Sequence, residues 1–412
     1  MVERFLGEGP VVSVIESSDR THRDQCAIAG IGVSEFSKDS HCSELTLATR
    51  AALAAIDDAG LNASDIDGVL RSDYDTVAHN DLADVLGMTN ITYWGQSGPG
   101  GIAPCSLIGQ AVGAVMSGQA TAVLVFRSLN GRSGQRYGQA STKRQAEVLG
   151  GRGTYDEFFT PFGLMTPAQM FGLMQQRHMS QYGTTAEDVG AIALACRRRA
   201  NANPGAQMRH RPLTMQEYLD ARMISRPLRL FDCCLETDGA AAVVVTTTER
   251  ARDLAQAPAV IRAVAHASGP RIQPGQMFPA LLRDSITSQP ARYTAQRLYE
   301  MAGLGADDVD VAQLYDCFTI TVLMELEDFG FCDTGEGGRF AASGAIELDG
   351  SLPINTGGGH LSEGYIHGMN HIVEGVRQIR GTSTSQVDGA EVCLVTSAPP
   401  PASSAMMLVA DR

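Results

Sequence analysis

The amino-acid sequence predicts an α/β protein made of two duplicated halves, and three observations support this prediction. The chain has 412 residues, whereas single hydrophobic cores stop growing at about 250 to 300 residues. Its 44% apolar residues and 44 glycines fit a well-buried α/β protein rather than a disordered one. Finally, the segment AGLNASDID at 59–67 recurs as AGLGADDVD at 302–310.

A second pair of matching segments occurs in the same order along the chain. In the first half, a glycine-rich turn and a helix pattern at 98–118 lead into the apolar run TAVLVF, and in the second half 357–381 lead into EVCLVT. Each copy of the shorter motif also follows an amphipathic helix pattern and precedes an apolar strand pattern. Two matched pairs in one order indicate an internal duplication rather than coincidence.

The first half begins with recognisable signals. Residues 1–24 are polar and unpatterned, which predicts an N-terminal arm. Residues 27–33, AIAGIGV, predict a buried strand that ends at glycines. Ser43 is followed by a helical pattern that runs to Ala59, so we expect a capped amphipathic helix there.

An irregular segment at about 131–228, with scattered Gly, Pro, Met and Arg, is inserted into the N-terminal half, which we place at 25–255. The C-terminal half at 256–412 then begins with a strand pattern at 260–267. The Phe and Met residues of the inserted segment predict either an apolar pocket wall or plain core. These residues are Phe158, Phe159, Phe162, Met165, Met170, Phe171 and Met174.

Composition excludes several classes of protein. A net charge of −14 argues against a general nucleic-acid binder and against binding to an anionic membrane surface. The nine cysteines are scattered without a C-x-x-C motif, and the histidine spacing suggests no zinc site. Without a signal peptide or a run of about 18 apolar residues, we expect a soluble cytoplasmic protein with reduced thiols and no metal.

One segment reverses the acidic character of the chain. Residues 197–229 hold eight arginines against Glu217 and Asp220, a net charge of +6. A solvated basic face is one interpretation. The other is a site for a polyphosphate ligand, such as a nucleotide or coenzyme A, because a local reversal within an acidic chain attracts phosphate groups.

The stretch 355–381, NTGGGHLSEGYIHGMNHIVEGVRQIRG, has the pattern of a catalytic loop. Its glycines allow the backbone to approach a ligand closely, and apolar residues at helical spacing follow them. A helix N-terminus gathers unpaired N–H groups beside a partial positive charge. Tyr365 and His367 are therefore expected where an anion or an enolate could be held.

The duplicated halves, the inserted segment and the run DGAAAVVV before the second half resemble the thiolase superfamily, over nearly the whole chain. The resemblance is strongest to the sterol-carrier-protein type and its relatives in bacterial steroid degradation. It implies two βαβαβαββ halves in a five-layered αβαβα core, a dimer, and coenzyme A bound by the inserted segment and nearby helices. The candidate coenzyme A ligands are Arg197, Arg198, Arg199, Arg226 and Arg229.

The sequence departs from the thiolase pattern at the cysteine motifs. Gly101, within GPGGIAPCS, stands where the family has its nucleophilic cysteine. Cys105 lies about one helical turn later and is expected to be a buried structural thiol. The terminal Cys-x-Gly motif, which serves as acid and base in thiolases, is replaced by SAPPP after the strand EVCLVT. Cys393 within that strand is expected in the core.

The other two motifs carry tyrosines instead. Tyr315 opens YDCF where the sterol-carrier type has HDCF, and Tyr365 replaces the histidine of the GHPxG turn. A thiolase without its nucleophile and its activating histidine cannot form an acyl-enzyme. The same tyrosine pair in such settings is typical of thiolase-like aldolases that shorten steroid side chains, the family that the chain resembles most.

The resemblance implies retro-aldol cleavage of a β-hydroxyacyl-CoA, which yields a ketone or aldehyde and a short acyl-CoA such as propionyl-CoA or acetyl-CoA. This reaction needs a base, an acid and a site for the enolate oxygen, but no covalent intermediate. We expect Tyr365 to take the hydroxyl proton and Tyr315 to return a proton to Cα, or the reverse. A helix N-terminus and the second phenol would lower the tyrosine pKa.

Further residues are expected around this centre. Backbone N–H groups are candidates for holding the thioester oxygen, and His367 is a candidate for a supporting role. His360 and His371 are expected to be surface or hydrogen-bonded histidines. The candidate backbone donors lie at Gly100 and Gly101 and in the 357–359 loop, at Gly358 and Gly359.

Two alternatives remain: an acyltransferase or thiolase component that uses Cys105 or another thiol, and a non-catalytic subunit that binds acyl-CoA. The tyrosines themselves could be two buried residues that only pack. The resemblance also implies a heterotetramer, in which a homodimer binds a small OB-fold, zinc-ribbon protein that itself binds acyl-CoA. No cofactor is expected in this chain, and zinc only in the partner.

Overall fold

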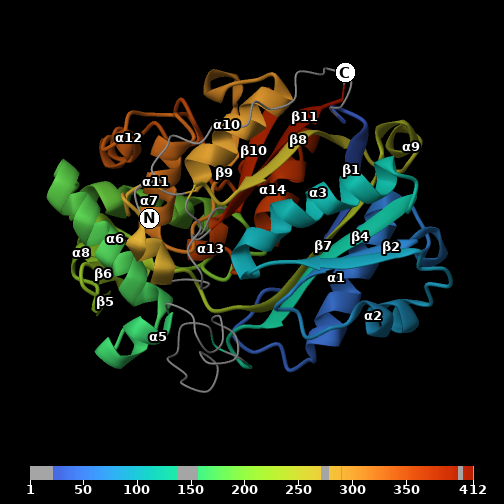
Figure 1. Ribbon diagram of the computed structural model, residues 1–412, viewed down its shortest axis with the longest axis horizontal. Helices are drawn as coiled ribbons and strands as arrows, with labels where there is room; N and C mark the ends of the chain where they lie inside the picture. Colours follow the sequence, from blue (N-terminus) through green and yellow to red (C-terminus); the bar gives the residue numbers. More distant parts are fainter. Residues whose placement is uncertain are drawn as a thin grey trace, which may run out of the picture.

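The computed structural model describes residues 22–134, 136, 156–270, 278–288, 290–397 and 402–411. Nearly all of the predicted N-terminal arm, part of the inserted segment and the SAPPP residues 398–401 lie outside these ranges. The described strands form a nine-stranded sheet in the order β3-β2-β4-β7-β1-β8-β11-β10-β9 and a separate two-stranded sheet, β5-β6 (Figure 1). Among the described residues, no helix is long and apolar enough to cross a membrane.

The large sheet is made of two half-sheets of mirrored order, which confirms the predicted duplication. The N-terminal half-sheet contains β1 (Cys26–Val33), β2 (Gly68–Ser72), β3 (Tyr93–Ser97), β4 (Ala122–Asn130) and β7 (Asp238–Thr247). The C-terminal half-sheet contains β8 (Ala259–Ala267), β9 (Val311–Gln313), β10 (Val392–Ser397) and β11 (Ser403–Ala410). Antiparallel pairing of β1 with β8, from Cys26↔Ile261 to Ile28↔Ala259, joins them. The counterpart of β3 is a single parallel bridge from Ala312 of β9 to Ile354.

Helices cover both outer faces and also separate the halves. Helix α1 (Glu44–Ala59) packs on β1, β4 and β7, while α10 (Ala291–Ala302) packs on β8 and β11. Helices α3 (Ala103–Met116) and α14 (Met369–Arg380) contact strands of both halves and therefore lie between them. This arrangement of helix and sheet layers is the predicted thiolase fold, and α3 and α14 are the helices of the two matched glycine-rich segments.

The remaining helices surround the ends of the sheet. Helix α2 follows β2, and the inserted segment supplies α5, α6, α7 and α8, which lie together on one side of the molecule (Figure 1). The bounds of all the remaining α-helices are α2 (His79–Leu86), α5 (Asp156–Phe159), α6 (Pro167–Tyr182), α7 (Ala186–Ala202), α8 (Met215–Leu219), α9 (Thr248–Arg252), α11 (Thr319–Asp328), α12 (Gly337–Ala342) and α13 (Gly359–Ser362). The two short strands are β5 (Met223–Ser225) and β6 (Leu228–Arg229).

The duplication extends to individual hydrogen bonds. The Asp67 carboxylate accepts from the backbone N–H groups of Thr121 (2.8 Å) and Ala122 (2.9 Å), where β4 begins. Asp310 Oδ2 accepts in the same way from Glu391 (2.9 Å) and Val392 (2.8 Å), where β10 begins. Each aspartate ends its copy of the repeated motif, so the repeat fixes the entrance of a sheet strand in both halves.

Candidate active site

A large cavity lies between the inserted segment and the ends of the half-sheets. Its volume is about 1090 Å³, at the upper end of the usual range for small-molecule sites. Gly100, Gly101, Tyr315, Tyr365 and His367 all line it. The structure thus gathers these candidates from the sequence on one wall, although they come from both halves of the chain.

Two tyrosines form the centre of that wall. Tyr315 follows β9, and Tyr365 lies in the loop between α13 and α14. Their hydroxyl oxygens are 2.9 Å apart, so one phenol donates a hydrogen bond to the other. Tyr315 is buried and Tyr365 is half-buried. The sequence thus identified two residues that meet across 50 positions of the chain.

The ionisation of the two phenols differs from expectation. Burial raises the pKa of both Tyr315 and Tyr365 well above the ordinary value, so both are protonated in the free protein. The predicted helix N-terminus does not act on Tyr365, because α14 begins only at Met369, after Gly368 in a left-handed conformation with φ +98°. The Tyr365 N–H instead donates to Thr237 Oγ1 at 2.8 Å. The expected lowering of the tyrosine pKa is therefore wrong.

Gly101 leaves the space that Tyr315 occupies. A Cβ atom built at Gly101 would lie 1.9 Å from the Tyr315 hydroxyl oxygen, far inside any real contact. By the resemblance of GPGGIAPCS to the thiolase motif, Gly101 stands where thiolases are expected to carry their nucleophile. The Tyr315 hydroxyl therefore fills the place in which a side chain at 101 would have to lie.

We expect Gly101→Ala to lower turnover about 10²-fold or more, because the added methyl group displaces the Tyr315 hydroxyl from its hydrogen bond. Turnover and thermal unfolding would be measured together. Gly113→Ala is the matched control, since a Cβ at Gly113, within α3, meets nothing within 4 Å. The control should keep full activity and gain up to about 1 kcal/mol of stability. Normal activity of Gly101→Ala would contradict this steric account.

Most of the backbone N–H groups predicted to hold the thioester oxygen are already bound or do not line the cavity. The Gly100 N–H donates to Asp73 Oδ1 (3.1 Å), and the Gly358 N–H donates to the Asn355 carbonyl (2.8 Å). Neither Gly358 nor Gly359 lines the cavity, and a Cβ at Gly359 would lie 2.1 Å from Asp316 Oδ2. The expected oxyanion role is wrong for Gly358 and Gly359, because Gly358 packs on Ala200 and Gly359 on Asp316, and neither lines the cavity. Gly101 remains, in the first turn of the short helix η4 (Gly100–Ile102), where N–H groups have no partner within the helix.

Cys105 is a structural thiol, as predicted. It is completely buried within α3 and does not line the cavity. Its sulfur accepts a hydrogen bond from Ser397 Oγ at 3.4 Å and donates to the Val395 carbonyl at 3.5 Å. Burial raises the pKa of Cys105 to about 12. A thiol that is neither accessible nor ionised is not a nucleophile, which removes the basis for an acyltransferase that uses Cys105.

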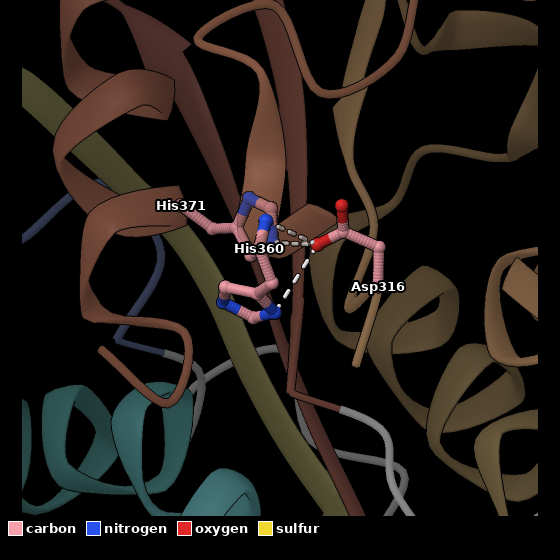
Figure 2. A group of neighbouring side chains, drawn as sticks. All are labelled: Asp316, His360 and His371. Atoms are coloured by element: carbon pink, nitrogen blue, oxygen red, sulfur yellow. Dashed lines mark hydrogen bonds and ion pairs between the residues drawn. The ribbon is translucent and has the colours of Figure 1, made fainter. Parts of the chain in front are cut away.

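Asp316, the residue after Tyr315, holds the glycine-rich loop by a buried cluster (Figure 2). The backbone N–H groups of His360 and Leu361 donate to Asp316 Oδ1 (2.8 Å) and Oδ2 (3.2 Å), respectively. His371 Nε2 lies 2.9 Å from the same Oδ1. His360 Nδ1 is 3.1 Å from Oδ1, but its direction does not suit a hydrogen bond. Both histidines are fully buried, so the expected surface location is wrong, and the expected hydrogen bonding holds for His371.

Charge in this cluster is concentrated on the carboxylate. Burial opposes ionisation of Asp316, but the two imidazoles and the His360 N–H outweigh it and lower its pKa to about 2. Burial and the neighbouring His371 lower the pKa of His360 well below its ordinary value, so that ring is neutral. Among the described residues, these three could hold a metal ion by type and spacing. Since the carboxylate already accepts several N–H donors, we interpret the cluster as a clip that holds the Tyr365 loop.

His367 is anchored by a residue that the sequence interpretation missed. Arg127 lies fully buried on β4 and donates from Nη2 to His367 Nδ1 at 2.8 Å. Arg127 also forms a buried ion pair with Asp75, which follows β2. The signal was present in the sequence, because an arginine interrupts the apolar run AVLVFRSLN of β4. A buried charge inside a core strand requires a partner.

Of the five arginines predicted to bind coenzyme A, only Arg197 lines the cavity. It donates to Ser362 Oγ (2.9 Å) and to the Arg211 carbonyl (3.0 Å). Arg198 and Arg199 pair with Glu347 instead, outside the cavity. Arg226 and Arg229 do not line it either. The basic residues that do line it, besides Arg197, are Lys38, Arg132, Arg136, Arg211 and Arg222.

The predicted apolar wall is also only partly present. Met170 and Phe171 line the cavity, whereas Met174 is buried core. Phe158 and Phe162 are 69% and 89% exposed and cannot be wall residues of this cavity as it stands. Phe159 and Met165 lie outside the lining. Other apolar residues take their place: Ile102, Leu129, Leu213, Ile224, Leu230, Phe231, Leu235, Phe318 and Leu361.

Residues 280–412 match the family model described as thiolase C-terminal domain-like. The chain is 44% identical to the steroid side-chain-cleaving aldolase of Thermomonospora curvata over 387 residues, 94% of this chain and 98% of that protein. It is also 44% identical to the 17-hydroxy-3-oxo-4-pregnene-20-carboxyl-CoA lyase of Mycobacterium tuberculosis over 374 residues, 90% of this chain and 96% of that protein.

Solved structures similar to this chain include an aldolase and a more distant acetyltransferase. A chain of the Ltp2-ChsH2(DUF35) aldolase superposes with a TM-score of 0.87 at 42% identity, covering 95% of this chain and 99% of that one. The acetyl-CoA acetyltransferase of Syntrophomonas wolfei superposes with a TM-score of 0.68 at 14% identity, covering 94% of this chain and all of that one. At that identity the likeness concerns the fold alone.

Proposed function

Because this chain belongs to the steroid side-chain-cleaving aldolases of the thiolase superfamily, we propose that it splits a steroid side-chain CoA thioester by retro-aldol cleavage. The chain is a carbon–carbon lyase. Its substrate carries a hydroxyl group on the carbon β to the thioester. The products are a ketone or aldehyde and a short acyl-CoA, such as propionyl-CoA or acetyl-CoA.

The observation that carries this proposal is a hydrogen-bonded tyrosine pair in a cavity wall that has no cysteine at the thiolase nucleophile position. Cys233, Cys234 and Cys317 also line the cavity, but burial raises the pKa of all three thiols and keeps them un-ionised. Claisen cleavage needs a residue that accepts the acyl group, and the described wall offers Gly101 at that place while Cys105 lies buried elsewhere. Retro-aldol cleavage needs only proton transfers and a site for the enolate, because the acyl group already carries coenzyme A. The tyrosine pair supplies groups for both proton transfers.

The high pKa of both phenols fits a relay of protons rather than a free phenolate. Tyr365 takes the proton of the β-hydroxyl and passes its own proton to Tyr315 across the 2.9 Å hydrogen bond. The Cα–Cβ bond breaks, its electron pair stays on Cα as the enolate, and the hydroxyl-bearing carbon becomes the carbonyl. Tyr315 gives its own proton to Cα as it receives the proton from Tyr365, so neither phenol carries two protons at any point. One proton has moved from oxygen to carbon, and neither phenol remains ionised.

Binding of the CoA moiety is the role proposed for the basic residues around the cavity. Lys38, Arg211 and Arg222 line it together with Arg197, and cationic groups recognise phosphates by charge-assisted hydrogen bonds. Arg132 and Arg136 already face Glu236 at 3.8 and 2.5 Å. The chemistry requires no cofactor of its own, so we propose that this chain binds none and that zinc occurs only in the partner.

The assembly proposed for this chain is a heterotetramer in the cytoplasm. The similar solved aldolase is described as a complex of Ltp2 with ChsH2(DUF35), which supports a small DUF35 partner here. We propose that this partner has an OB-fold and a zinc ribbon, binds acyl-CoA and flanks a homodimer of this chain.

Deuterium labelling tests the proposal. The chain and a DUF35 partner would be supplied with a β-hydroxylated steroid side-chain CoA thioester in D₂O. We expect release of the ketone or aldehyde together with short acyl-CoA that carries one deuterium at Cα, and no acyl-enzyme by mass spectrometry. An acylated protein would favour a thiolase-type reaction. Binding of CoA thioester without turnover, with the partner present, would favour the non-catalytic subunit.

A further inference from the structure

A buried chain of three charged or polar side chains runs behind the active-site wall, from Asp75 through Arg127 to His367. Asp75 and Arg127 are completely buried at their side-chain ends and form an ion pair. Asp75 accepts two further hydrogen bonds, from the backbone N–H groups of Ser72 and Ser128, each 2.8 Å long. The carboxylate is thus held by β2 and β4, and it fixes the guanidinium in turn.

The other side of the guanidinium is directed at a single nitrogen of His367. Arg127 Nη2 and Nε lie 2.8 Å and 3.3 Å from His367 Nδ1. A guanidinium can only donate hydrogen bonds, and it stays charged at any pH that proteins tolerate. Nδ1 must therefore be the acceptor. A neutral imidazole with an acceptor at Nδ1 carries its proton on Nε2.

The same contact keeps the ring neutral. Protonation of His367 would place an N–H on Nδ1, directed at two N–H groups of a buried cation, which is unfavourable for both charge and hydrogen bonding. The rings of Tyr365 and Tyr74 also face His367, at centroid distances of 4.7 and 6.4 Å. Burial raises the pKa of Tyr365, so its phenol is protonated and supplies no negative charge that would favour an imidazolium.

The imidazole of His367 belongs to the active-site wall. His367 lines the cavity together with Tyr365, Gly100 and Gly101. A Cβ built at Gly100 would lie 3.9 Å from His367 Cε1, the carbon between the two ring nitrogens. His367 is also one of the few non-glycine residues with a positive φ, +48°. Such a conformation costs free energy and occurs where surrounding contacts hold a residue for a purpose.

We propose that His367 donates a hydrogen bond from Nε2–H to the thioester oxygen of the enolate, and that Arg127 with Asp75 is the positioning pair that fixes this tautomer. The inference rests on the proposed retro-aldol reaction for the identity of the ligand. A neutral donor suits the site, because it stabilises the developing oxygen charge over the whole pH range in which Arg127 holds Nδ1.

Two substitutions at one position test the donor. In His367→Gln, the side-chain carbonyl can accept from Arg127 while the amide N–H faces the cavity, so both hydrogen bonds are retained. His367→Leu retains neither. We expect kcat to fall about 10²- to 10³-fold in His367→Leu and less than about 10-fold in His367→Gln. Equal losses in both variants, with folding intact, would overturn the donor role.

The positioning pair is tested by the pH profile of a double variant. Asp75→Asn and Arg127→Met are combined, because removal of one partner alone would leave a buried charge unpaired. His367 can then be protonated, so kcat/KM should acquire a new acidic limb near pH 6.5, the ordinary histidine pKa. A uniform loss of activity without this limb would show that the pair is merely structural.

The tautomer can be read without any turnover, which separates this inference from the proposed function. In protein with ¹⁵N-labelled histidine, the signals that vanish in His367→Gln belong to His367. We expect an unprotonated Nδ1 and a protonated Nε2 from about pH 5.5 to 8.5. A protonated Nδ1 within this range would overturn the assignment, whether or not the chain cleaves a steroid thioester.

Discussion

Tyr365→Phe is expected to lower kcat about 10³-fold, within the range that one acid–base group supplies, with a much smaller change in KM. The substitution removes a single oxygen from a ring that otherwise stays in place. That oxygen is one end of the 2.9 Å hydrogen bond to Tyr315, through which the proton is proposed to pass. Without it, the β-hydroxyl proton has no path to Cα, although the substrate can still bind.

The two phenols should behave as one unit. Tyr315→Phe interrupts the same relay, so it should cost about as much as Tyr365→Phe, and the double variant should be little worse than either. Independent effects would instead multiply. The assay measures release of the ketone or aldehyde in the presence of the partner. Near-normal turnover in both single variants would refute the relay.

Cys105→Ser is the control for this series. The thiol is buried within α3, away from the cavity, so its replacement by another small side chain should leave turnover almost unchanged. A large loss of turnover in Cys105→Ser would favour the thiolase interpretation, because only a reaction through the Cys105 sulfur depends on that sulfur. The three variants together therefore separate chemistry at the tyrosine oxygens from chemistry at the Cys105 sulfur.

The sequence was sufficient for features whose signals are local. The nine-residue repeat predicted the duplicated halves. In the structure, the aspartate that ends each copy, Asp67 or Asp310, binds the backbone of a neighbouring strand. The tyrosine pair was also predictable. Tyr315 and Tyr365 replace residues of two motifs that meet in the thiolase fold, so their proximity followed from the resemblance rather than from any spacing.

Features that depend on long-range partners were predicted poorly. The arginine cluster was read as one basic site, but Glu347 lies about 150 positions away and pairs with Arg198 and Arg199. No sequence pattern near these arginines predicts such a distant partner. Helix α14 was expected to begin near Tyr365 because Ile366 fits the helical spacing. It begins at Met369, since Gly368 and His367 both have positive φ and interrupt the helix before that residue.

Asp316→Ala is expected to have the largest effect on stability, about 3 to 5 kcal/mol of unfolding free energy. The carboxylate is fully buried and binds the backbone of the glycine-rich loop at His360 and Leu361 as well as the ring of His371. Its removal leaves these donors unsatisfied. The loop continues to Tyr365, so turnover should fall too, although Asp316 itself does not line the cavity.

Asp310→Ala provides the matched control for this carboxylate. Asp310 also accepts two backbone N–H groups, from Glu391 and Val392, but it is exposed, whereas Asp316 is buried. We expect a loss of about 1 to 2 kcal/mol and full activity. Chemical unfolding followed by circular dichroism measures both variants. Similar losses of unfolding free energy in Asp316→Ala and Asp310→Ala would mean that the buried histidines do not stabilise the glycine-rich loop.

The pH dependence of the Asp316 contribution has a definite sign. The pKa of Asp316 is about 2 in the folded protein, below its ordinary value of 3.8, so the folded state favours the ionised form. This part of the stability, about 2 kcal/mol, is fully present above about pH 4 and is lost as the pH falls toward 2. The stability difference between the native protein and Asp316→Ala should therefore narrow over that interval. A stability difference that stayed constant with pH would mean that the contacts of Asp316 do not depend on its charge. Packing, rather than the carboxylate charge, would then hold the glycine-rich loop.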